Sequence, residues 1–162
     1  MSTAVLDSNV RTDRRPRTGV SRLGAALPPR LMAAALCVAV AVIHIKDQGG
    51  FPGHKEPSYI GMGYFLLELG AAAAAVLLLS KAYRKGWFLS LGVAAGPLIG
   101  YVLTRGPGLP LATDDRGNWT ESIGVMSLVV EGVLLLLILA VAARRGAARS
   151  AEQSVRSAHV WS

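Results

Sequence analysis

Four long stretches of this chain contain neither lysine nor arginine, and their lengths approach that of a membrane-crossing helix. They are residues 31–45, 59–80, 87–104 and 122–143. The last three contain 22, 18 and 22 residues. A helix needs ~20 predominantly apolar residues to cross the apolar part of a bilayer. The sequence therefore predicts an all-α fold, a four-helix transmembrane bundle within residues 28–145.

The first stretch is the shortest, with fifteen residues. Pro28 and Pro29 suit the first turn of a helix, where the missing N–H of proline costs nothing. The Arg30 side chain can extend along the helix to the membrane surface. With these residues and one further turn at the other end, we expect the first span at about 29–47.

A signal peptide is the alternative interpretation of this segment. An arginine-rich start, an apolar run and the triplet Ala-Val-Ala at 39–41 have the form of such a peptide with its cleavage site. However, the segment before the apolar run is long for a signal peptide, and the run continues beyond the cleavage site to Ile43. We therefore expect the span to remain in the protein.

Positive charges are divided unevenly between the two ends of the predicted bundle. The two terminal tails and the loop at 81–86 hold thirteen Lys and Arg, whereas loops 46–58 and 105–121 hold four. Basic residues accumulate on the cytoplasmic side of membrane proteins, so most of the net charge of +7 is a topology signal. The sequence predicts cytoplasmic termini and two outside loops. Arg greatly outnumbers Lys, and Ala and Gly are abundant. This composition is typical of a GC-rich bacterial genome, so we expect the membrane to be a bacterial plasma membrane.

Residues 1–27 and 146–162 are predicted to be basic cytoplasmic tails. Neither has apolar residues at helical spacing, and we expect the N-terminal tail to be disordered. Neither combines basic residues with interleaved aromatics or a folded nucleic-acid-binding module. We therefore expect contact with anionic lipid and not with nucleic acid.

Composition excludes several functional classes. The single cysteine, Cys37, excludes an internal disulfide, a CxxC redox pair and thiolate-clustered metal sites. Three histidines are too few for a di-haem membrane cytochrome. Because no catalytic motif is present either, we expect a protein without catalysis of its own and without a cofactor.

Glycines recur every four residues in the third span, at Gly92, Gly96 and Gly100. This spacing places them on one face of a helix and leaves that face without side chains. Small residues in such a row allow a second helix to approach closely. We therefore expect helix packing at this face.

Spans two and four share a pattern at a shift of 63 residues. Gly61 matches Gly124 in this alignment, and Glu68 matches Glu131. One interpretation is a parallel repeat, in which two hairpins are related by an axis along the membrane normal.

Glu68 and Glu131 are acidic residues near the middle of predicted spans. Each lies nine residues into its span, which places it ~13–14 Å deep, close to the bilayer midplane. Tyr64 and Ser127 lie four residues earlier, on the same helix faces. An ionised side chain at this depth costs about 2.5–3.5 kcal/mol. We expect a titrating pair with supporting hydroxyls or, alternatively, two neutral acids that hydrogen-bond between helices.

A metal-ion site is a further candidate, although we expect no metal to be required. The side chains that would coordinate the ion at the outer side are His44, His54, Asp114 and Asp115. Nitrogen and oxygen atoms of this kind suit a divalent cation. Their spacing matches neither an EF-hand nor an HExxH helix, so the hypothesis has no template.

Two segments have distinctive sequences. Residues 58–68 contain Ser-Tyr-Ile-Gly followed by Phe-Leu-Leu-Glu, and residues 105–125 read RGPGLPLATDDRGNWTESIGV. They resemble the small four-span integral membrane proteins of actinobacteria. The resemblance extends over 31–143. It implies a four-helix plasma-membrane protein and brings no activity or catalytic residue with it.

Two functions fit the sequence. The first is an accessory or scaffold subunit of a larger membrane complex, because the predicted loops are short and a glycine face is available for packing. The alternative is a proton- or cation-handling transporter or channel that uses Glu68 and Glu131. The expected partners are the lipid bilayer and either further copies of the chain or other membrane-protein subunits.

Overall fold

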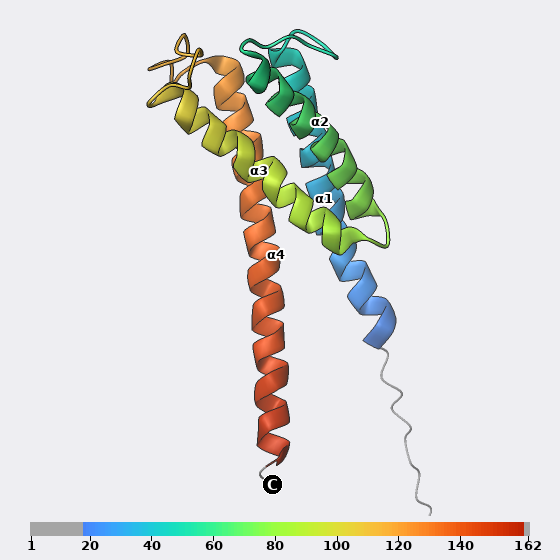
Figure 1. Cartoon of the computed structure of the whole chain (residues 1–162). Coiled ribbons are helices and arrows are strands. Elements are labelled where there is room, and N and C mark those ends of the chain that lie inside the picture. The colour runs from blue at the N-terminus through green and yellow to red at the C-terminus, as the bar shows by residue number, and fades with distance from the viewer. Residues whose placement is uncertain (1–17, 161–162) are drawn as a thin grey trace, which may run out of the picture.

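The computed structural model describes residues 18–160, which form four α-helices (Figure 1). They are α1 (Thr18–Asp47), α2 (Ser58–Leu79), α3 (Tyr83–Arg105) and α4 (Ser122–Val160). Each contains a segment long and apolar enough to cross a membrane, namely Leu27–Asp47, Ser58–Leu79, Tyr83–Arg105 and Ser122–Ala151. No β-strand occurs within the described residues. The predicted all-α, four-helix fold is confirmed.

The connections lie at opposite ends of the bundle (Figure 1). Residues 48–57 and 106–121 lie together at one end, which we call the loop end. Residues 80–82 lie toward the other end, which we call the tail end, because α1 begins and α4 finishes on that side. The grouping matches the hairpin connectivity expected of four successive spans.

The four helices pack as a ring with one unfilled diagonal. The pairs α1–α2, α2–α3, α3–α4 and α4–α1 are in contact, and α1 also touches α3. Within the described residues, α2 and α4 do not contact each other. In Figure 1, α3 runs obliquely across the bundle. The space between α2 and α4 is therefore bounded by α1 and α3.

The packed core occupies the half of the spans nearer the tail end. Many of its buried residues are small, and they are Ala33, Ala34, Cys37, Ala71, Ala74, Ala75 and Ala94. Larger fully buried side chains, Leu78 and Leu134, fill the remaining space. Because lipid is as apolar as a protein core, helices associate in a membrane chiefly through close packing, which small residues allow.

Gly86, near the start of α3, lies tightly against the backbone of α2. A Cβ atom at this position would lie 2.7 Å from the backbone nitrogen of Leu78, closer than such atoms pack. The absence of a side chain therefore sets how near the start of α3 can come to the end of α2.

Arg30 closes the tail end of α2. Its Nε donates to the Leu78 carbonyl at 2.7 Å, and its Nη2 donates to the Ser80 carbonyl at 2.9 Å. Its guanidinium also lies 4.5 Å from the centre of the Tyr83 ring. The last carbonyls of α2 need donors, and the planar guanidinium of Arg30 supplies two.

The first and last helices, α1 and α4, extend further than the sequence predicts. α1 begins at Thr18, so Pro28 and Pro29 lie inside the helix and not in its first turn. α4 continues to Val160, where an irregular tail is expected from 146 onward. Extending an existing helix is easier than nucleating one, and the residues after Ala143 are rich in the good helix formers Ala and Arg. The expectations for 1–17 and 161–162 lie outside the described residues.

Candidate functional site

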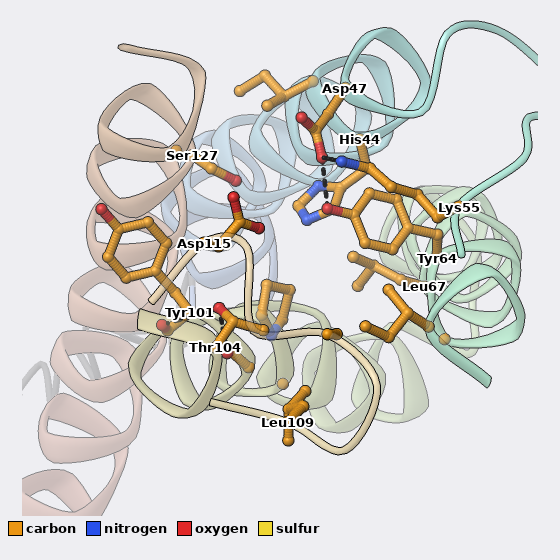
Figure 2. A pocket seen from close by; sticks show the side chains of 18 of the residues that line it. His44, Asp47, Lys55, Tyr64, Leu67, Tyr101, Thr104, Leu109, Asp115 and Ser127 are labelled. Atoms are coloured by element: carbon orange, nitrogen blue, oxygen red, sulfur yellow. Dashed lines mark hydrogen bonds and ion pairs between the residues drawn. The ribbon is translucent and has the colours of Figure 1, made fainter. Parts of the chain in front are cut away.

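A cavity of about 790 Å³ opens at the loop end of the bundle, in the space between α2 and α4 (Figure 2). Residues from all four helices and from both loops line it. Pockets that hold small organic molecules have volumes of about 300–1,000 Å³. The cavity is thus far larger than a single ion requires.

The glycine face of α3 forms one wall of this cavity. Gly92, Gly96 and Gly100 all line it, and a Cβ atom built on any of the three would have nothing within 4 Å. No helix among the described residues packs on this face, so helix packing here would need another chain and stays a prediction. The physical reason is that the α2–α4 diagonal is unfilled, so the missing side chains contribute to an open volume.

His44 and Glu131 face each other from α1 and α4. His44 Nε2 lies 3.8 Å from Glu131 Oε1, and the Glu131 side chain is 1% exposed. Ser127, one helical turn earlier on α4, donates its hydroxyl to the same oxygen at 2.6 Å. All three residues line the cavity.

The orientation of the His44 ring is fixed by the backbone of its own helix. Its Nδ1 lies 3.0 Å from the Val40 carbonyl oxygen, which can only accept a hydrogen bond. Nδ1 therefore carries a proton in this arrangement. Nε2 remains free to hold or release a second proton on the side facing Glu131.

A second polar group lies beside His44 and consists of Asp47, Lys55 and Tyr64. The Tyr64 hydroxyl donates to Asp47, and Lys55 Nζ lies 3.0 Å from the same carboxylate. Figure 2 shows both interactions beside the His44 ring, whose centre is 5.1 Å from that of Tyr64. Tyr64 thus supports Asp47 and not Glu68. Asp47 is placed by its position three residues after His44, on a neighbouring part of the same helix face.

Arg105 organises the mouth of the cavity. Its Nη1 lies 3.2 Å from Asp115, and its Nη2 pairs with Glu121. The guanidinium also lies 4.6 Å from the centre of the Tyr101 ring. The Tyr101 hydroxyl donates to the Trp119 carbonyl at 2.7 Å, which ties α3 to the loop 106–121. This loop is therefore attached to the cavity rim at several points.

Glu68 occupies a different environment from Glu131. It is buried, at 4% exposure, but does not line the cavity. Gln48 donates its side-chain amide to Glu68 Oε1 at 2.5 Å, while Glu68 Oε2 is buried without a partner. Within 18–160, no hydrogen bond joins the two glutamates. Sequence reasoning missed Gln48, although its place four residues after His44 puts it on the same side of α1.

The candidate metal ligands do not come together. His54 and Asp114 are exposed, and Asp115 is paired with Arg105. His44 lies deeper, beside Glu131. Among the described residues, no group of three or more His, Cys, Asp or Glu side chains is placed to hold a metal ion.

The fold and site define a class of protein. Four long apolar helices are compatible with an integral membrane protein in contact with lipid, and this one has a cavity, lined by both polar and apolar residues, that opens at the loop end. Comparison with family models, curated proteins and solved structures finds no match to this chain. The geometry of the cavity is therefore the basis on which a function can be assigned.

Proposed function

We propose that this protein is a proton- and cation-handling transporter of the plasma membrane, and that His44 and Glu131 form its proton site. The observation that carries the proposal is the approach of His44 Nε2 to Glu131 Oε1, 3.8 Å apart at the wall of a cavity. In the orientation that the positive charges favour, this cavity faces the outside.

Burial explains why this pair suits one shared proton. An isolated charge is costly at such a position, but a histidine and a glutamate with one exchangeable proton between them have no net charge. The proton can reside on either partner, and the pair titrates as a unit. Ser127 donates to Glu131 and supports the carboxylate form, while the Val40 carbonyl supports the protonated ring.

Access to the site is unequal from the two ends of the bundle. The cavity opens at the loop end, whereas the buried core around Leu78 and Leu134 fills the tail half. A channel needs a continuous path, but a transporter exposes its site to one side at a time. The arrangement therefore favours a transporter in one of its two accessible states.

The subunit hypothesis is the second candidate, and the projection of α4 favours it. This helix continues to Val160, past the tail end of the other spans (Figure 1). Its residues Arg144, Arg145 and Arg149 are exposed there. A basic helix outside the bundle provides a surface for an anionic lipid headgroup layer or for an acidic partner subunit.

The proton site is tested by infrared spectroscopy of the full chain in lipid while the buffer pH is stepped. The wild type is expected to show a titrating carboxyl band that disappears in Glu131→Gln. Glu68→Gln is the matched control, because this buried glutamate lies outside the cavity lining, and it is expected to retain the band. An unchanged titration in Glu131→Gln would overturn the proposal.

A further inference from the structure

The size and the lining of the cavity point to a ligand larger than a proton or a metal ion. Its volume of about 790 Å³ exceeds that of an ion many times over, and no metal-binding group exists among residues 18–160. One wall consists of the glycine face of α3, which has no side chains and is continued by Leu89 and Pro97. Such a wall accommodates a flat or extended apolar body.

The charged groups that line the cavity determine which sign of charge a ligand should carry. Six carboxyl groups line it, those of Asp47, Glu56, Asp114, Asp115, Glu121 and Glu131. The basic lining residues are Lys55 and Arg105, besides His44. Lys55 is paired with Asp47, and Arg105 is paired with two acids, so neither is free to bind an anion. The field inside the cavity therefore favours a cation.

Glu131 is the counter-ion that such a cation can reach. Its side chain is almost completely buried and lines the cavity, where it faces His44 and accepts a hydrogen bond from Ser127. The acids nearer the mouth are either paired with basic residues or exposed to solvent. A buried carboxylate attracts a cation more strongly than a solvated one, because water screens it less.

We propose that the cavity binds an organic monocation with an apolar body, and that its charge replaces the proton of the His44–Glu131 pair. This inference rests on the proposed proton site. Before binding, the pair holds one exchangeable proton; afterwards Glu131 is a carboxylate and His44 is a neutral imidazole. One positive charge enters the site and one proton leaves through the open loop end, so the charge balances.

Most other titratable and charged groups that line the cavity are held in local partnerships, and Glu56 and Asp114 are exposed to solvent. The partnered groups are Asp47 on α1, Lys55 in the first loop, Tyr64 on α2, Arg105 on α3, Asp115 in the second loop and Glu121 before α4. Because these groups compensate one another, the His44–Glu131 pair is the group that exchanges its proton with the ligand.

The test uses the full chain in lipid nanodiscs and two probes of nearly the same shape. Benzyltrimethylammonium carries the positive charge, and neopentylbenzene has carbon in place of its nitrogen. Calorimetry, corrected with empty nanodiscs, is expected to detect binding of the cation at least tenfold tighter than that of the neutral probe. Affinity is expected to rise about tenfold per pH unit while the pair is protonated, with one proton released per cation, as measured in buffers of different ionisation enthalpy.

Two variants separate the charge from the apolar wall. Glu131→Gln keeps the shape of the side chain and is expected to reduce cation binding at least tenfold, while Glu68→Gln preserves it. Gly96→Leu fills the wall and is expected to block binding without changing the proton site. Equal binding of both probes, undiminished binding to Glu131→Gln, or no binding by either probe would overturn the inference. If the infrared titration of Glu131 persists in that event, the proposed proton site still stands.

Discussion

His44 Nε2 on α1 lies 3.8 Å from Glu131 Oε1 on α4, across the edge of a cavity that all four helices line. The two residues are 87 positions apart in the chain and meet because α4 packs back against α1. The contact combines a proton acceptor, a proton donor and an opening to solvent in one place. It is the arrangement from which the functional account follows.

Ser127 is expected to set how easily Glu131 binds a cation. Its hydroxyl donates to Glu131 Oε1 at 2.6 Å, and a hydrogen bond to a charged group contributes roughly 1.5–3 kcal/mol. Ser127→Ala is therefore expected to weaken benzyltrimethylammonium binding about 10- to 100-fold at fixed pH. Ser127→Thr keeps a hydroxyl and serves as the control. Calorimetry that gives equal affinities for wild type and Ser127→Ala would show that this hydrogen bond is irrelevant to binding.

Gly86 and Gly92 form a matched pair for testing helix packing. Gly86→Ala places a Cβ atom 2.7 Å from the Leu78 backbone and is expected to destabilise the bundle by about 1–3 kcal/mol. Gly92→Ala meets nothing within 4 Å and is expected to leave stability unchanged or slightly raised, because alanine favours helix. Thermal unfolding of both variants in detergent measures the difference. The reverse order of stabilities would contradict the packing described for α2 and α3.

Arg30 is expected to resist replacement by lysine. Arg30→Lys preserves the charge but cannot reproduce the two hydrogen bonds to Leu78 and Ser80 together with the stacking on Tyr83. We expect a loss of about 1–2 kcal/mol in the free energy of unfolding, measured by denaturant titration in detergent. Lys81→Arg, on an exposed side chain between α2 and α3, provides a control that is expected to be neutral. Equal stability of Arg30→Lys and wild type would exclude a capping role for this residue.

Cys37 is expected to react slowly with thiol reagents. Its side chain is fully buried between α1 and α3, where its Sγ lies 3.5 Å from Ser90 Oγ. A maleimide is expected to label it at least tenfold faster after denaturation than in the folded protein, since burial hinders access of the reagent to the thiol. Labelling followed by mass spectrometry measures both rates, and rapid labelling of the folded chain would contradict the packing at this position.

The spans were predictable because membrane insertion depends on local composition. Stretches without Lys or Arg locate all four helices, and the burial of Glu131 follows from its cost in lipid. The helix ends were less predictable. The capping of α2 by Arg30 and the continuation of α4 to Val160 depend on contacts and cooperativity that a hydropathy pattern does not contain.

The cavity could not be predicted from the sequence, for a different reason. The spacing of Gly92, Gly96 and Gly100 shows that one helix face is bare, but not whether another helix or an open volume lies against it. That outcome depends on α2 and α4 remaining apart, which is a property of the whole ring. Likewise, the repeat of Glu68 and Glu131 at 63 residues did not reveal that Gln48 holds one glutamate while Ser127 and His44 face the other.

Proton movement coupled to cation entry is the most direct test of the central claim. Proteoliposomes that contain the full chain and a pH-sensitive dye are given external benzyltrimethylammonium at equal pH on both sides. The interior is expected to become more alkaline with the wild type and with Glu68→Gln, because each entering cation displaces a proton, whereas Glu131→Gln is expected to abolish the change. No change with the wild type, or an equal change with Glu131→Gln, would contradict proton handling by His44 and Glu131.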